Sequence, residues 1–305
     1  MEFAHHDKIA PKLGVIPYQR TGQELRVGQS AAPVPTQPPY DDPAFFSTPI
    51  LMQGLSPECG GYSAAFAIAY LLSLQTKLSG SFTYAFEKTV DGVPDAAGTT
   101  IAAIGQAAQS AGSCLDTLFQ DDGTSPDDLN GTPSLYSAAT PEAIQDAFAR
   151  AGWLSLFLND LSWNGLQAAI SKYKTVLVEA EVGEEWWTNA EGKESWAAAD
   201  VLPIRPPKTV IDSHFFVLGG EYDSEKINFA NSWSTEWGEN GFGYFQENYL
   251  PFIKNAIVLF KAPPSIQTIV NHPTLPQAEK NSLIQQILDD IEQAVALISK
   301  ETSGN

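Results

Sequence analysis

The stretch QGLSPECGGYSAAFAIAYLLSL, residues 53–74, decides the fold of this chain. From residue 61 to residue 74, small and apolar residues follow one another for about four helical turns, with no Pro and no charged residue. A helix that is apolar on every side packs inside a core rather than along a surface. We therefore expect residues 61–74 to form a buried helix, with Cys59 standing where that helix begins.

Cys59 and Gln53 are the first candidate site residues. The reactive form of cysteine is the thiolate, and the unpaired N–H groups at a helix amino terminus stabilise it. Buried, unreactive cysteines are common, so the position of Cys59 alone indicates little. Gln53 lies six residues earlier, and its side-chain amide can join the Cys59 backbone N–H as a pair of donors to an oxyanion, which acyl transfer requires. This combination makes Cys59 a candidate nucleophile.

His214 is the candidate base. It stands at the entry to the run FFVLGG, residues 215–220, which predicts a strand. Asn231 and Trp233 follow in the block NSW. Asn231 can accept a hydrogen bond from the imidazole and fix its tautomer, and Trp233 can cover that bond. The other three histidines stand near the amino terminus or between loop-like segments: His5, His6 and His272.

These two blocks together resemble papain-like cysteine peptidases. The shared features are Gln-Gly ahead of a Cys that opens a long helix, a His that starts a strand, and an Asn-Ser-Trp block that closes in WGENG at residues 237–241. The similarity extends from residue 13 to residue 259. The resemblance implies these roles: Cys59 as nucleophile, His214 as general acid and base, Asn231 as the residue that orients His214, Gln53 as oxyanion donor and Trp233 as shield of the triad.

The chain departs from the family pattern beside the nucleophile. The residue after the nucleophile is usually large and here is Gly60, and Pro57-Glu58 replaces the family's Gly-Ser. Glu58 would raise the pKa of the neighbouring thiol if it faced inward. The long inhibitory propeptide of the family is also missing, and residues 13–17 (LGVIP) resemble the lead-in of bacterial members without one.

The segment pattern predicts an α+β protein, with helices in the first half and antiparallel strands in the second. The expected helices cover residues 61–74, 100–111, 141–151 and 161–173, and the expected strands cover residues 175–182, 215–219, 227–230, 243–246 and 256–260. Segregated helices and strands leave a cleft between two halves. The resemblance implies the two-lobed papain-like fold, with a β-barrel-like second half and the active site in that cleft. We expect an extended arm over residues 1–45, a peptidase domain over residues 46–262, and a linker and helix over residues 263–305.

The composition is that of a folded, acidic protein. The formal net charge is −19 and 43% of the residues are hydrophobic, which allows a sizeable core and disfavours binding to nucleic acid or anionic membranes. We expect no membrane span and no secretory signal. If Cys59 is a free thiol, Cys114 has no partner for an intramolecular disulfide, which favours a reducing compartment such as the cytoplasm. Packaging in a larger particle stays open.

An acidic loop at residues 120–133 is the one stretch with a metal-like pattern. Its Asp128-Leu129-Asn130-Gly131 slightly resembles a calcium loop, but the acidic residue that would close such a loop is absent. We interpret this stretch as a solvated loop, and we expect neither a metal nor a cofactor.

The tail carries one long helical pattern over residues 277–300. Its apolar seam steps by four and three residues through Ile284, Leu288, Ile291, Val295 and Ile298. The seam is too short for a firm coiled-coil prediction, and Leu283 and Ile287 widen it. We favour packing onto the protein's own domain, with contact to a second copy or another partner as the alternative.

The resemblance implies a cysteine endopeptidase that acts on polypeptides through an acyl-enzyme. It also implies that Leu177 and Phe215 line the pocket for the second residue upstream of the cut, and their bulk predicts an apolar, narrow pocket. Two alternatives stay open. One is a binding or structural protein on this fold that has lost its chemistry. The other is a different Cys-His acyl transferase, of transglutaminase or amidase type, although such enzymes typically place Asp after the His.

Overall fold

The computed structural model describes most of the chain between residues 13 and 289. The described residues are 13–21, 24–27, 36–54, 56–93, 96–120, 139–261, 266, 269, 274–276, 278–287 and 289. Several predictions of the preceding section fall outside them: the acidic loop at 120–133 apart from Gln120, the histidines His5, His6 and His272, and the seam residues Leu288, Ile291, Val295 and Ile298.

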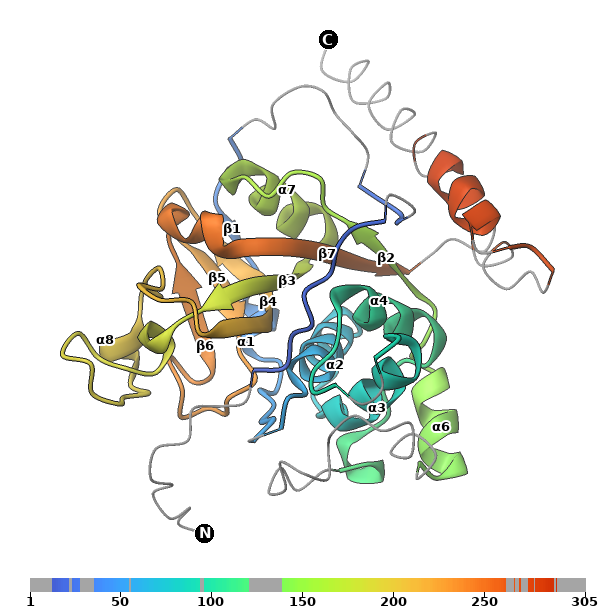
Figure 1. The fold of residues 1–305 in the computed structure, drawn as a ribbon, viewed down its shortest axis with the longest axis horizontal. Helices are drawn as coiled ribbons and strands as arrows, with labels where there is room; N and C mark the ends of the chain where they lie inside the picture. The colour runs from blue at the N-terminus through green and yellow to red at the C-terminus, as the bar shows by residue number, and fades with distance from the viewer. Residues whose placement is uncertain are drawn as a thin grey trace.

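Helices gather on one side of the molecule (Figure 1). They are α1 (Pro43–Phe46), α2 (Cys59–Leu71), α3 (Gly80–Val90), α4 (Ile101–Ser110), the short η1 (Asp116–Leu118) and α6 (Pro141–Phe148). Three of them begin with a hydroxyl cap, in which Ser79, Thr100 and Thr140 accept a backbone N–H from the first helical turn. The predicted buried helix is confirmed as α2, in which every residue from Cys59 to Tyr70 is buried.

An antiparallel sheet forms the other side. Its strands are β2 (Trp153–Phe157), β7 (Ile253–Lys261), β3 (Thr175–Val182), β4 (Asp212–Tyr222), β5 (Ile227–Ala230) and β6 (Phe242–Phe245), in that order, with the short β1 (Tyr40–Asp41) paired to β4. The remaining short helices are α7 (Trp163–Tyr173), η2 (Glu184–Trp186), α8 (Ala198–Val201) and η3 (Glu247–Phe252). The α+β arrangement expected from the sequence is confirmed.

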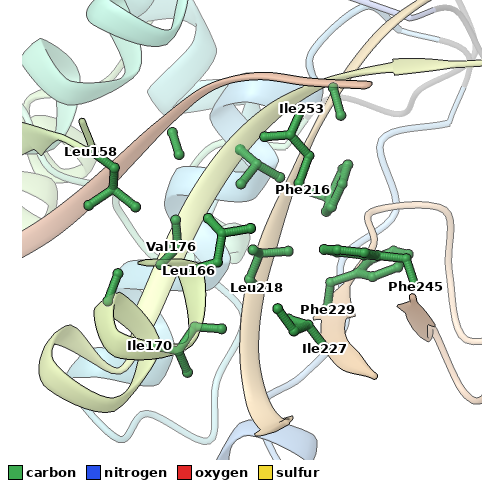
Figure 2. Packing of buried hydrophobic residues seen from close by; sticks show 14 of the residues in the cluster. Leu158, Leu166, Ile170, Val176, Phe216, Leu218, Ile227, Phe229, Phe245 and Ile253 are labelled. Atoms are coloured by element: carbon green, nitrogen blue, oxygen red, sulfur yellow. The ribbon is translucent and has the colours of Figure 1, made fainter. Parts of the chain in front are cut away.

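Each face of the sheet packs against a different hydrophobic cluster. Along β3, Val176 and Val178 belong to the cluster that also holds Leu166 and Ile170 of α7 (Figure 2). Leu177, between them, belongs to the cluster around α2. Because successive strand residues point to opposite faces, α7 covers one face of the sheet and α2 lies against the other. The start of α2 is thereby held beside β3 and β4.

Residues 24–27 contact both β2 and the helical residues 278–287. Phe157 of β2 donates its backbone N–H to Leu25 and accepts from Val27. Gln285, in the helical residues 278–287, binds the N–H and C=O of Arg26 through its side-chain amide (2.8 and 3.1 Å). Ile284 is buried beside it and Leu283 is exposed, while the packing of the whole seam onto the protein's own domain stays a prediction.

The extended arm expected over residues 1–45 contains one short strand and the start of one short helix. They are β1 and α1, whose Asp42 caps the helix through a bond from the Ala44 N–H. Within the described residues, no helix combines the length and the apolar character that a membrane crossing requires.

Candidate active site

Cys59 is the first residue of α2, and its side chain is fully buried. The preceding Glu58 makes no side-chain hydrogen bond to the helix end, so the first N–H groups of α2 face the site without a side-chain cap. The backbone N–H groups of Phe215 and Gly14 lie against the thiol. Burial raises the pKa of Cys59 to about 12, partly offset by these N–H groups. In this arrangement the sulfur is a neutral thiol at pH 7.

His214 lies on β4, immediately before Phe215. The backbone of Phe215 interacts with the Cys59 thiol, so His214 is the sequence neighbour of a residue at the thiol. Its Nε2 is 2.9 Å from Oδ1 of Asn231. Nδ1 of His214 has no hydrogen-bond partner among the described residues. Burial lowers the pKa of His214 to about 4, while the bond to Asn231 acts in the opposite direction. The imidazole is therefore neutral, with one nitrogen engaged by Asn231 and the other still available.

Aromatic rings enclose the imidazole. Trp233 lies 4.9 Å from His214 between ring centroids, and Trp186 meets the same ring edge-on at 5.8 Å. Trp186 also packs against Trp233 and Trp237, and all three are almost fully buried. Trp186 was not predicted as a site residue, although the paired Trp186-Trp187 in the sequence was a visible signal. The rings keep water away from the His214–Asn231 bond.

The side-chain amide of Gln53 forms hydrogen bonds with two neighbouring serines. Its Nε2 donates to the Ser56 carbonyl at 2.9 Å, and its Oε1 accepts from the Ser232 hydroxyl at 2.5 Å. Its backbone N–H binds the Ser232 carbonyl. Gln53 thus ties the loop before Cys59 to the loop after Asn231.

Gly60 departs from the family pattern because other side chains fill its space. A Cβ there would meet the Thr99 methyl at 2.5 Å, a Glu87 oxygen at 3.0 Å and Ile104 at 3.2 Å. The Glu87 carboxyl is fully buried, and burial, with the charge of Glu58, raises its pKa well above the usual range. Glu58 accepts from the Ser81 hydroxyl at 2.8 Å. A larger residue after the nucleophile would have to displace this packing.

An amino-terminal segment crosses the site. In Figure 1 the dark blue trace of the first described residues runs along the junction of the helices and the sheet. Thr99 donates its N–H to the Gly14 carbonyl (3.0 Å) and accepts from the Ile16 N–H (2.7 Å). Val15 packs in the cluster that contains Cys59 and Phe215. We call residues 13–20 the covering segment. It contacts the thiol directly, which explains the complete burial of Cys59.

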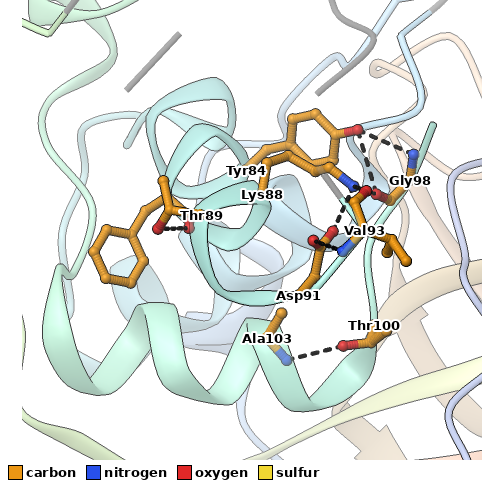
Figure 3. Close-up of polar contacts among 9 residues, drawn as sticks. Tyr84, Lys88, Thr89, Asp91, Val93, Gly98, Thr100 and Ala103 are labelled. Carbon is orange, nitrogen blue, oxygen red and sulfur yellow. Dashed lines mark hydrogen bonds and ion pairs between the residues drawn. The ribbon is translucent and has the colours of Figure 1, made fainter. Parts of the chain in front are cut away.

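Thr99, which binds the covering segment, follows a loop that a buried lysine holds in place (Figure 3). Lys88 forms an ion pair with Asp91, and its ammonium donates to the carbonyls of Val93 (3.0 Å) and Gly98 (2.7 Å). The Tyr84 hydroxyl accepts the Gly98 N–H at 3.0 Å. Gly98 precedes Thr99, so this network sets the position of the residue that holds Gly14 and Ile16.

Lys88→Met is expected to lower the free energy of unfolding by about 3 kcal/mol, because it leaves Asp91 as a buried charge without its partner. Denaturant unfolding followed by circular dichroism measures the change. The matched control is Lys193→Met, whose ion pair with Glu191 is mostly exposed and contributes under about 1 kcal/mol. Equal effects of the two changes would contradict the structural role of Lys88.

A cavity of about 350 Å³ opens elsewhere, beside β4, β5 and β6. Its lining includes Glu221, Asn228, Glu239 and Tyr244, and contains neither Cys59 nor His214. The space at the thiol is already filled by the covering segment. The candidate site is therefore identified by its chemistry and not by this cavity.

The structure also places the two residues expected to line a substrate pocket. Phe215 and Leu177 are both fully buried and share the cluster around α2. In the pairing of β3 with β4, Leu177 lies opposite Val217, and the residue opposite Phe215 is Glu179.

Comparisons with known proteins find relatives by structure alone. No family model matches the chain, and none of the curated proteins matches it. Xylellain, a cysteine protease from Xylella fastidiosa, aligns with a TM-score of 0.67 at 16% identity, over 84% of this chain and 99% of its own. The procathepsin B S9 of Trypanosoma congolense aligns at 0.57 and 10% identity, over 83% and 87% of the two chains.

A third solved structure is the Carica candamarcensis cysteine protease CMS1MS2 in complex with E-64. It aligns with a TM-score of 0.52 at 16% identity, over 74% of this chain and 100% of its own. At such low identities the likeness establishes the fold, and the chemistry has to be argued from the residues. The chain has the papain-like fold of cysteine proteases.

Proposed function

We propose that this protein is a cysteine peptidase that hydrolyses peptide bonds through Cys59, His214 and Asn231. The observation that carries the proposal is the 2.9 Å bond between His214 Nε2 and Asn231 Oδ1, shielded by Trp233. It sits next to the strand residue whose N–H touches the Cys59 thiol. A nucleophile, a base and a group that orients the base are the three parts that covalent acyl transfer needs.

The arrangement supports the following chemistry. Asn231 engages Nε2, which leaves Nδ1 of His214 to take the proton from Cys59. The thiolate attacks the peptide carbonyl, and the Cys59 N–H with the Gln53 amide stabilises the oxyanion. The imidazolium protonates the leaving amine, and water then hydrolyses the thioester with His214 again as base.

Activity requires that the covering segment leaves the site. With the segment in place, burial holds the pKa of the thiol high and that of His214 low, so the two groups stay neutral. Once solvent and substrate replace residues 13–16, the desolvation that causes both shifts falls. The neutral pair can then become thiolate and imidazolium.

The test is a comparison of three activities on the full chain under reducing conditions. Cleavage of an internally quenched peptide, blocked by a cysteine-directed epoxide, supports the peptidase. Incorporation of a labelled amine into a glutamine peptide, without cleavage, would support a transglutaminase-type acyl transferase instead. Binding of peptide with neither reaction would indicate a protein that keeps the fold and has lost the chemistry.

Gln53→Ala is expected to lower kcat by about 10²- to 10³-fold, because it removes one oxyanion donor. The amide of Gln53 also binds Ser56 and Ser232, so thermal unfolding is measured in parallel. Gln53→Glu serves as the matched control, since it keeps the shape and the acceptor for Ser232 but loses the donor. If the rate follows thermal stability across the two variants, the role of Gln53 is structural.

A further inference from the structure

Glu179 is a buried carboxylate, on the strand next to Phe215, that the proposed reaction does not use. It lies opposite Phe215 in the pairing of β3 with β4, and opposite Asn255 in the pairing of β3 with β7. Directly opposed residues of neighbouring strands project from the same face. Phe215, whose N–H touches the Cys59 thiol, therefore shares a row with Glu179 and Asn255. This row forms the wall of the site next to the nucleophile.

The two polar members of the row act as one acceptor group. Asn255 donates its Nδ2 to Oε2 of Glu179 at 3.0 Å, and Glu179 also faces the backbone N–H of Tyr18. The carboxylate is only 2% exposed. Among the described residues, Glu179 has no ion pair with Lys, Arg or His. Lys254, whose charge reaches it, pairs instead with Glu181 at 2.7 Å.

The covering segment already places a cation at this group. Arg20 donates its Nε to Oδ1 of Asn255 at 3.2 Å and a terminal N–H to the Leu158 carbonyl at 2.8 Å. Its guanidinium lies 5.2 Å from the centre of the Phe157 ring, a cation–π distance. Asn255 also binds the Tyr18 carbonyl at 3.3 Å. A planar, charged donor of the protein's own chain therefore binds the Asn255 member of the pair.

A buried carboxylate costs free energy unless a cation or several donors compensate it. Here part of the compensation comes from the Tyr18 N–H, and Arg20 binds the neighbouring Asn255; both residues belong to the covering segment. When that segment leaves, Glu179 and Asn255 lose those donors and face the site. The ligand that replaces them best carries a positive charge and several N–H groups, as a basic side chain does.

We propose that Glu179, together with Asn255, selects substrates with a basic side chain, Arg above all, in the pocket beside Cys59. This inference rests on the proposed peptidase function and deepens it. It replaces the simple apolar pocket expected from Leu177 and Phe215 with an apolar wall that carries one acidic group. The net charge of −19 adds a general attraction for such substrates.

The experiment compares N-acylated fluorogenic peptides that differ at one residue, either arginine, its neutral isostere citrulline, or leucine. The position is varied one residue at a time upstream of the cut. Full-length protein is used. Closure by the covering segment lowers the kcat/KM of every peptide by the same fraction, so it cancels from the ratio of two kcat/KM values. At the position that contacts Glu179, we expect kcat/KM for arginine to exceed that for citrulline by about 10- to 100-fold.

Glu179→Gln is the deciding variant, because it keeps the shape of the side chain and one acceptor oxygen and removes its charge. We expect the arginine-to-citrulline ratio to fall towards one, whatever common factor the variant applies to the rates of all the peptides. Glu225→Gln, at an exposed position in the turn between β4 and β5, is the control for net charge and should keep the ratio. Should Glu179→Gln fold poorly, Asn255→Ala should reduce the same ratio.

Two negative results are distinguishable. Hydrolysis with no preference for arginine, or with a preference that survives in Glu179→Gln, would overturn this inference and leave the peptidase standing. Hydrolysis of none of the peptides would overturn the peptidase and this inference with it.

Discussion

Cys59→Ala should reduce peptide hydrolysis by about 10⁶-fold, to the background of the assay, because it removes the sulfur that we propose as the nucleophile. The change is small, and α2 is buried on all sides by other residues, so the fold should persist. His214→Ala should cost nearly as much. The double variant should be no worse than either single one, since the two residues act as a unit.

The controls for this result are thermal unfolding of each variant and the substitution Cys114→Ser. Cys114 is buried in a separate cluster with Phe82 and Ala143, and we expect the rate to be unchanged when it is replaced. Hydrolysis that persists in Cys59→Ala while Cys114 is intact would contradict the assignment.

Gly14→Ala should activate the protein. A Cβ at Gly14 would lie 1.8 Å from the Pro57 carbonyl oxygen and 2.3 Å from its carbon, so the covering segment cannot keep its place over Cys59. The thiol then loses the burial that raises its pKa to about 12. A fall towards the ordinary ~8.5 increases the thiolate fraction at pH 7 by more than about 10³-fold.

The measurement is the rate of alkylation of Cys59 by iodoacetamide between pH 5 and pH 10. A thiol reacts above its pKa, so a lowered pKa moves the rise in rate to lower pH. Gln19→Ala, at an exposed position of the same segment, should behave as the unchanged protein. If Gly14→Ala reacts no faster than the unchanged protein at pH 7, the segment does not control the thiol.

Much of the site could be read from the chain because its residues stand at element boundaries. Cys59 is the first residue of α2, next to an apolar run that predicts a buried helix, and His214 is the third residue of β4, just before the apolar run that predicts that strand. Asn231 follows β5 directly, as its place after a short apolar run indicates. In each case local pattern and tertiary position agree, which makes prediction from sequence possible.

Other features could not be read because they depend on contacts between distant segments. Helix α3 contains Phe82, Thr83, Tyr84 and Phe86, residue types that favour strands. Its packing against α2 stabilises the helical conformation over this preference. Glu179 looks like the polar half of an alternating strand. Only the register of β3 against β4 and β7 brings it beside Phe215 and Asn255.

The covering segment is the clearest example of this limit. Residues 13–20 contain no helix or strand pattern, and their position is fixed by backbone bonds to Thr99 and by the space that Gly14 and Gly98 leave. A Cβ at Gly98 would lie 2.4 Å from the Gly14 carbonyl carbon. A close contact between two glycines that are far apart in the sequence produces no hydrophobic periodicity, so the sequence pattern does not predict it.

The most direct test of the central claim is to treat the Gly14→Ala protein with an epoxide inhibitor and map the adduct by mass spectrometry. The protein contains two cysteines, Cys59 and Cys114, so each molecule carries its own control. We predict a single adduct, on Cys59, whose formation slows by orders of magnitude when His214→Ala is added. An adduct on Cys114, or labelling of Cys59 at the same rate without His214, would contradict the account.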